Sequence, residues 1–239
     1  MRAEAMKPEP KSDWPRLALC MALALGSTTL RAQVPPSAGD IAQLGALHGA
    51  AHHGDPKRMA AALASGIAPN SRDRHGRTPL HVATFARQRD AIRQLAKAGA
   101  DLGALENDRY DAVTIAAVAD DEETLALLLS LGASAKLTTS RYDGTALIAA
   151  AHLGHDGVVR QLIAAGAPLD HVNNLHWTAV IEAIVLGDGG ARHQACLRAL
   201  VDAGANLALA DRSGQTPLQL ARSRGYEAMV RILQGAPAR

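Results

Sequence analysis

Residues 173–194, NNLHWTAVIEAIVLGDGGARHQ, gather side chains of the kinds that do chemistry in enzymes and metal sites. Glu182 lies within an apolar run, and burial raises the pKa of a carboxyl group, which would let Glu182 act as a general base. His176 and His193 are of the type that binds metals. The glycine-rich turn at residues 187–190 could bind a phosphate through its backbone N–H groups.

The context of these residues argues against each of these sites. The pattern predicts no strand before the glycine turn and no lysine after it, as a phosphate loop requires. Asp188 alone supplies too few oxygen ligands for calcium. His152 and His155 have the i, i+3 spacing of ligand pairs, but a turn at Gly154 separates them. No nucleophile or second carboxylate recurs near Glu182. We therefore predict no catalytic residue, no metal and no cofactor.

Composition limits the classes of function. Apolar residues make up 48% of the 239 residues but aromatic residues only 3%, so alanine and leucine must build the core. That bias suits closely packed helices. The formal charge of +2 comes from the first 32 residues, which hold five basic and three acidic side chains. The balanced remainder is not the basic surface that binds nucleic acid.

Residues 1–32 have the features of an export signal. Basic residues precede the apolar run LALCMALALG, residues 17–26, and a polar stretch ending in Ala32 follows. Ten apolar residues are too few to span a bilayer. We predict a signal peptide over 1–32, a linker over 33–40, and a mature periplasmic chain that is not bound to the membrane. An uncleaved anchor is the alternative. The mature chain would keep only Cys196 and form no internal disulfide.

Beyond residue 40 the sequence repeats itself with a period near 33 residues. GRTPLHVATF begins at Gly76 and GQTPLQLARS at Gly214, and four weaker copies align with them. The spacings between copies are 33, 33, 34, 33 and 38 residues. The aligned position, called the origin below, is occupied by Gly45, Thr78, Asp111, Thr145, Thr178 and Thr216. A fixed period of this length predicts stacked units.

Each copy predicts two helices. Threonine or aspartate at the origin caps the first helix, and Pro79 and Pro217 suit its first position. Five residues after the origin every copy has an alanine, which lets the two helices approach closely. Glycine ends the second helix in five copies, at Gly66, Gly99, Gly132, Gly166 and Gly204. One copy cannot bury its apolar face, whereas six stacked copies share a continuous core.

The motif TPLHVA and the 33-residue period resemble those of ankyrin repeats. The resemblance implies an all-α ankyrin solenoid of about six helix–turn–helix units joined by β-hairpin loops, filling residues 41–239. The units are expected near residues 41–69, 70–102, 103–136, 137–169, 170–207 and 208–235. The segment DHVNNLHWTAVIEAIVLGDGG is similar to the repeat sequence of a subgroup of exported bacterial ankyrin proteins. The five residues inserted around LGDGGARH are then expected to be a family feature that lengthens the inter-helix turn.

Glu182 stands out against the repeat. The equivalent residues are all apolar or glycine: Gly49, Val82, Ile115, Ala149 and Leu220. A buried carboxylate needs hydrogen-bond partners, which His176, the Trp177 indole or the long turn could supply. We predict a structural clasp, formed by Glu182 and His176, that holds the inserted loop. An enzyme built around Glu182 and residues 187–193 is the less favoured alternative.

The resemblance also implies where a partner would bind, namely the loop tips and the exposed ends of the first helices. Aromatic residues and arginine anchor interfaces, and four of the five aromatics of the mature chain fall at these positions. We predict a non-catalytic monomer that binds a protein partner through this concave face. A structural or self-associating module is the alternative. The predicted contact residues are Arg74, His75, Arg77, Phe85, Asn107, Asp108, Tyr110, Arg141, Tyr142, His152, Asn174, Leu175 and Trp177.

Overall fold

The computed structural model describes residue 33 and residues 35–236. The predicted signal peptide, residues 1–32, lies outside the described residues. Within them, twelve helices form six consecutive pairs, as the repeat predicts. The pairs are α3 (Ala46–His53) with α4 (Pro56–Ala64), α5 (Pro79–Phe85) with α6 (Arg89–Lys97), α7 (Ala112–Val118) with α8 (Glu122–Ser130), α9 (Ala146–Leu153) with α10 (Asp156–Ala164), α11 (Ala179–Val185) with α12 (Ala191–Asp202), and α13 (Pro217–Ser223) with α14 (Glu227–Gln234).

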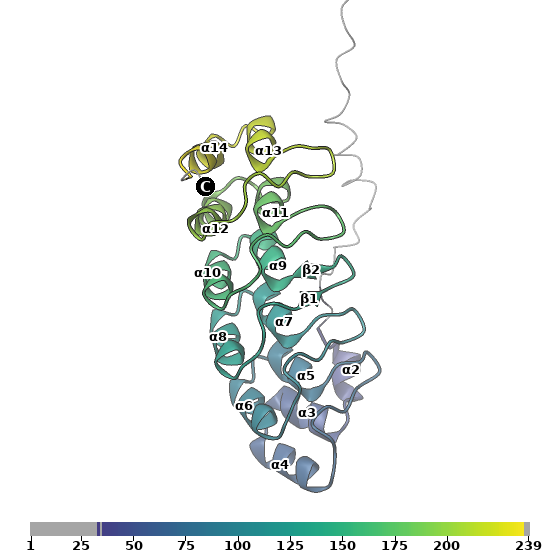
Figure 1. Ribbon diagram of the computed structural model, residues 1–239. Helices are drawn as coiled ribbons and strands as arrows, with labels where there is room; N and C mark the ends of the chain where they lie inside the picture. The colour runs from purple at the N-terminus through teal and green to yellow at the C-terminus, as the bar shows by residue number, and fades with distance from the viewer. Residues whose placement is uncertain (1–32, 34, 237–239) are drawn as a thin grey trace, which may run out of the picture. The chain divides into compact units, whose positions relative to one another are not determined.

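The pairs stack in two layers of helices. The first helices pack on one another in sequence order, from α3 to α13, and the second helices form the other layer (Figure 1). The loops between units project from the side of the first helices (Figure 1). This arrangement places the residues just before each first helix, and the exposed residues at its end, along one row of the stack.

The predicted caps and core positions are confirmed. Thr145, Thr178 and Thr216 each accept a hydrogen bond from a backbone N–H in the first turn of the helix that follows. Asp111 does the same for Thr114, at 2.9 Å. The alanine five residues after each origin is at most 3% exposed in all six units. The glycines predicted to end the second helices all have positive φ, between 77° and 97°. Close helix packing on alanine therefore explains the aromatic-poor composition.

Two features of the loops differ from the expectation. Among the described loops, only one forms strands: β1 (Thr138–Thr139) pairs antiparallel with β2 (Gly144–Thr145). An additional helix, α2 (Ala38–Ala42), begins inside the stretch expected to be a linker, so that prediction is wrong for residues 38–40. The cause is a capping box, in which the Ser37 side chain and the Asp40 carboxylate bind each other's backbone N–H groups.

The five inserted residues are only partly a loop. The turn between α11 and α12 ends at Gly190, and the next three residues already belong to α12. That helix has 12 residues, whereas α10 has nine. The prediction of a simple lengthened turn is therefore wrong for residues 191–193, because the insertion adds almost one helical turn.

Candidate functional site

The loops before α5, α7, α11 and α13 are each organised by one side chain, five residues before the origin. Asp73, Glu106 and Asp211 each accept two backbone N–H groups from residues two and four positions later, at 2.8–3.0 Å. Asn173 does the same through Oδ1, which accepts the N–H groups of Leu175 and Trp177 at 3.0 Å. An amide therefore replaces the carboxylate in this loop.

The amide at residue 173, in place of a carboxylate, explains how Glu182 is held. The amide of Asn173 carries N–H donors that a carboxylate lacks, and both side chains are buried. Nδ2 of Asn173 donates to Oε1 of Glu182 at 2.9 Å. Burial raises the pKa of Glu182 to about 7, and the hydrogen bond from Asn173 only partly opposes this rise. The pair thus connects α11 to the loop that carries Leu175 and Trp177.

The predicted partner of Glu182 is wrong. His176 is exposed, and Glu182 accepts a hydrogen bond from Asn173 and none from His176, so the clasp is formed by Asn173 instead. His152 of α9 approaches the carboxyl group, with Nδ1 3.5 Å from Oε2 of Glu182. The sequence did hold a signal for Asn173, because this loop position is acidic in most copies.

His176 instead occupies a strained backbone position. Its φ is 63°, where the equivalent Gly76 and Gly214 have 71° and 76°. A side chain at positive φ costs about 1 kcal/mol relative to glycine. We expect His176→Gly to keep or raise the free energy of unfolding, by up to about 1 kcal/mol, in urea titration. The reverse change Gly214→His, in open space, is the matched control and should lower it. A clearly lower free energy of unfolding for His176→Gly would instead support the predicted contact between His176 and Glu182.

The inserted turn is held by its neighbours on both sides. His193 binds Asp188 through Nδ1 at 2.8 Å and the carbonyl oxygen of His152 through Nε2 at 2.9 Å. The Tyr226 hydroxyl donates to the carbonyl oxygen of Gly187 at 3.1 Å. Both nitrogens of His193 are therefore engaged in holding the turn.

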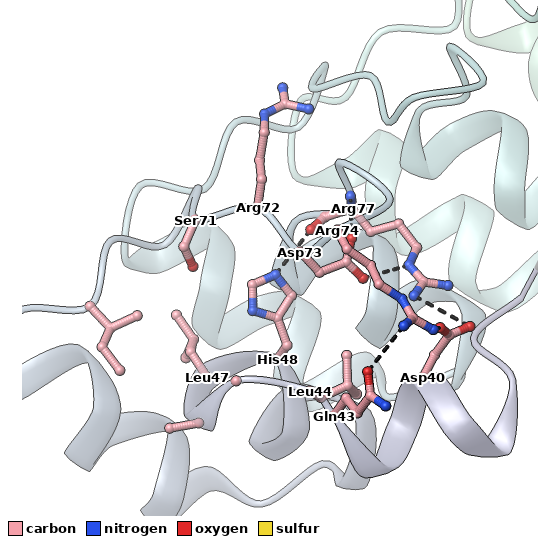
Figure 2. Close-up of a pocket in the computed structure, with 13 residues that line it drawn as sticks. Asp40, Gln43, Leu44, Leu47, His48, Ser71, Arg72, Asp73, Arg74 and Arg77 are labelled. Atoms are coloured by element: carbon pink, nitrogen blue, oxygen red, sulfur yellow. Dashed lines mark hydrogen bonds and ion pairs between the residues drawn. The ribbon is translucent and has the colours of Figure 1, made fainter.

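Arg74, His75 and Arg77 surround one carboxylate. Asp40 of α2 accepts a hydrogen bond from Arg74 and lies 3.8 Å from Arg77 (Figure 2). Nε2 of His75 lies 3.1 Å from the same carboxylate. Arg77 is buried and also pairs with Asp73 at 2.7 Å. The prediction that Arg77 lies on an exposed contact surface is therefore wrong. Arg74 and His75 hold α2 against this loop.

A cavity of about 430 Å³ adjoins this cluster, between α2, α3 and residues 71–77. Figure 2 shows His48 at its wall, where Nε2 lies 3.0 Å from the carbonyl oxygen of Arg77. Arg72 is directed away from the cavity and donates to the carbonyl oxygens of Gly76 and Leu105. The cations beside the cavity are thus already paired within the protein.

Several predicted contact residues join adjacent loops to one another. The backbone N–H of Asn107 donates to the carbonyl oxygen of His75, and that of Asn174 to the carbonyl oxygen of Tyr142, at 3.1 and 3.0 Å. Arg141 pairs with Asp108 at 2.6 Å. These contacts fix the row of loops. Partner contact by Asn107, Asp108, Arg141 and Asn174 stays a prediction.

The aromatic residues do not form one exposed stripe. Tyr110 is only 9% exposed, so its predicted place on the contact surface is wrong. Trp177 is partly buried and packs on the core, and Phe85 at the end of α5 is also partly buried. Tyr142 is exposed. The sequence indicated the positions but not how far the neighbouring unit covers each side chain.

Exposed apolar side chains gather in one part of the array. Among the described residues, five large hydrophobic side chains are 38–44% exposed, and all lie between residues 142 and 186. We call them the apolar set: Tyr142, Leu153, Val172, Leu175 and Leu186. Tyr142 and Leu175 lie in the loops before α9 and α11, and Leu153 and Leu186 lie at the ends of these two helices. His152 is beside Leu153 and is 40% exposed.

Neither a metal cluster nor a membrane-spanning helix occurs among the described residues. Across the described chain, no three His, Cys, Asp or Glu side chains meet as metal ligands would. None of the described helices combines the length and the hydropathy needed to cross a bilayer. Cys196 is buried, and burial raises the pKa of its thiol to about 12. The absence of a metal, a cofactor and catalysis stays a prediction.

Comparison with known proteins assigns the family. The profile described as "Ankyrin repeats (3 copies)" matches residues 19–106, 47–139, 113–211 and 147–238. The putative ankyrin repeat protein YahD of Escherichia coli strain K12 is 34% identical over 190 residues, which cover 79% of this chain and 94% of YahD. An ankyrin repeat domain from Acinetobacter baumannii AYE is 44% identical, with a TM-score of 0.75, and the match covers 81% of this chain and 98% of that domain.

A more distant relative is the p105 subunit of nuclear factor NF-kappa-B from Gallus gallus. It is 28% identical over 71% of this chain but only 17% of its own length. The stacked helix pairs, the capped TPLH-type motifs and these matches agree on one fold. Ankyrin repeats are generally protein–protein interaction modules. This chain belongs to the ankyrin-repeat family.

Proposed function

We propose that this chain binds a protein partner through the loops and first helices of the units at residues 137–169 and 170–207. The observation that carries the proposal is the apolar set, which is confined to these two units among the described residues. Single exposed apolar residues are normal on any protein, but a local concentration marks an interaction surface. The concave face of the family is the expected location of such a surface.

The local structure supports this proposal because it holds the apolar set in place. Asn173 fixes the backbone around Leu175 with two hydrogen bonds, and the Asn174 amide donates to the carbonyl oxygen of Arg141 at 3.0 Å. The backbone N–H of Asn174 also binds the loop that carries Tyr142. A loop that is already ordered loses less entropy when a partner binds, which favours affinity.

The surface can be tested with a variant that changes only exposed positions. Leu153→Ser, Leu175→Ser and Leu186→Ser together should leave the melting curve near that of the wild type, since exposed substitutions cost little. The same variant should lose partner capture. The control is Ser213→Ala with Arg224→Ala, at the positions of the last unit that correspond to Leu175 and Leu186. Undiminished capture by the triple variant would contradict the proposal.

Self-association is the alternative that the same apolar set could support. Size-exclusion chromatography with light scattering distinguishes it from partner binding. If the wild type is a dimer and the triple variant is a monomer, these units form a surface between copies of this chain. The proposed function expects a monomer in both cases.

We further propose that the chain is exported to the periplasm and begins at Gln33 after cleavage. The support is the short apolar run at residues 17–26 with its basic start and polar exit. Intact-mass measurement of protein from the periplasmic fraction should give a chain that begins at Gln33. Recovery of only the full-length chain, in the membrane fraction, would show an uncleaved anchor.

A further inference from the structure

A buried carboxyl group that is unique to its unit lies in α11, between Leu175 and Leu186 of the apolar set in the sequence. Glu182 is only 4% exposed, at a position where the other five units carry glycine or apolar residues. Asn173 uses Oε1, whereas Oε2 has no hydrogen-bond partner among the described residues. A buried carboxyl oxygen without a donor destabilises a protein. Glu182 therefore offers an acceptor that a ligand could use.

His152 lies between this oxygen and the surface. Its Nδ1 is 3.5 Å from Oε2 of Glu182, which is too long for a good hydrogen bond, and its side chain is 40% exposed. Burial lowers the pKa of His152, so the ring is neutral at neutral pH and does not neutralise a carboxylate. Leu153 ends α9 directly after His152, and Leu186, the residue that follows α11, is four residues after Glu182. The free oxygen thus lies next to a half-exposed ring, and two exposed leucines lie at the ends of the helices that carry His152 and Glu182.

We propose that Glu182 receives a basic side chain, lysine or arginine, of the protein partner. This inference rests on the proposed function and specifies the chemistry of the partner at that surface. The cationic nitrogen would donate a charge-assisted hydrogen bond to Oε2, which is stronger than a neutral one. The methylene stem of the same side chain would pack on Leu153 and Leu186. Because Oε2 is buried, the His152 side chain would rotate aside when the cation enters.

The groups around Glu182 set the dependence on pH. Glu182 faces His152 of α9 and Asn173 of the loop before α11. His193 of α12 binds the carbonyl oxygen of His152 and the carboxylate of Asp188. On the other neighbour, α13, the one charged residue is Arg222, which is exposed. A basic side chain of the partner binds best when Glu182 is ionised and His152 is neutral. Both states become more populated as pH rises, so binding should strengthen with pH.

A phage-displayed library of random 12-residue peptides provides the probe. Peptides are selected on the wild-type protein, and those that also bind the Leu153→Ser, Leu175→Ser, Leu186→Ser variant are removed. The remaining peptides should contain a lysine or arginine next to an apolar residue. They should bind Glu182→Gln about tenfold or more weakly. Glutamine can still accept from Asn173, so a melting curve at pH 8 confirms that this variant is folded.

The pH profile separates recognition from a structural role. Affinity for the wild type should rise about tenfold between pH 6 and pH 8, as the carboxyl group ionises, and stay flat for Glu182→Gln. Peptides that bind the apolar set without a basic residue, or that bind Glu182→Gln as tightly, would overturn this inference and leave the proposed function standing. A library that yields no peptide sensitive to the leucine changes would overturn both.

Discussion

Asn173→Asp is expected to lower the free energy of unfolding by about 3 kcal/mol at pH 8, and Glu182→Leu in the same chain is expected to restore it. The single change puts two carboxyl groups where Nδ2 of Asn173 now donates to Glu182 at 2.9 Å. Like charges at that distance in a buried site repel each other strongly. The two changes together reproduce the combination of the last unit, where Asp211 anchors the loop and Leu220 stands at the position of Glu182.

Urea titration of the two single variants and the double variant gives the coupling between the residues. The double variant should unfold within about 1 kcal/mol of the wild type, because a buried polar pair can often be replaced by well-packed apolar residues. Asp211→Asn is the reciprocal control, since Leu220 offers no acceptor for an amide. A double variant no more stable than Asn173→Asp alone would show that the loop anchor and α11 are not coupled.

The second large effect is a dependence of stability on pH that disappears in Glu182→Gln. The folded state raises the pKa of Glu182 from 4.5 to about 7, so the folded chain binds this proton more tightly than the unfolded chain. The contribution of Glu182 to stability therefore falls as pH rises from about 4.5 and levels off above 7. The total change is about 3 kcal/mol.

His152 acts in the opposite direction. Because burial lowers its pKa, its contribution to stability is lost as pH falls through its unfolded value of 6.5. The difference between wild type and Glu182→Gln, measured by urea titration from pH 5 to pH 8.5, removes the histidine from the comparison. A difference that stays constant over this range would mean that Glu182 is ionised throughout and is better solvated than its position indicates.

The repeat could be predicted from the sequence because its signals are local and occur six times. Threonine at the origin caps a helix by geometry that depends only on the next three residues. The same holds for the left-handed glycines after each second helix. The alanine five residues after each origin can also be understood from a single unit, since any larger side chain there would separate the two helices. These positions therefore appear in the structure where the period places them.

The pairing of side chains between units could not be predicted in the same way. Tyr110 and Trp177 both precede an origin by one residue, yet Tyr110 is buried, at 9% exposed, whereas Trp177 is only partly buried. Arg77 is buried because Asp40 and Asp73 both reach it, and Asp40 belongs to a helix that the period does not include. Burial in an array depends on adjacent units and on the ends, which a period does not describe.

The partner of Glu182 illustrates the same limit at the candidate site. Sequence proximity suggested His176, but its backbone lies in the left-handed region and its side chain is exposed. Asn173 and His152 reach the carboxyl group from the loop and from the preceding unit. The unusual glutamate was visible in the sequence, whereas its surroundings required the fold.

Site-specific photo-crosslinking in cells locates the surface that contacts the partner. A photoreactive phenylalanine analogue is placed in turn at Leu175 and Leu186, and at their counterparts Ser213 and Arg224 in the last unit, in cells that make the protein. Leu175 and Leu186 should crosslink to one and the same protein partner, whereas Ser213 and Arg224 should give no crosslink. Crosslinks to that partner only from Ser213 and Arg224 would contradict the assignment of the binding surface to residues 137–207.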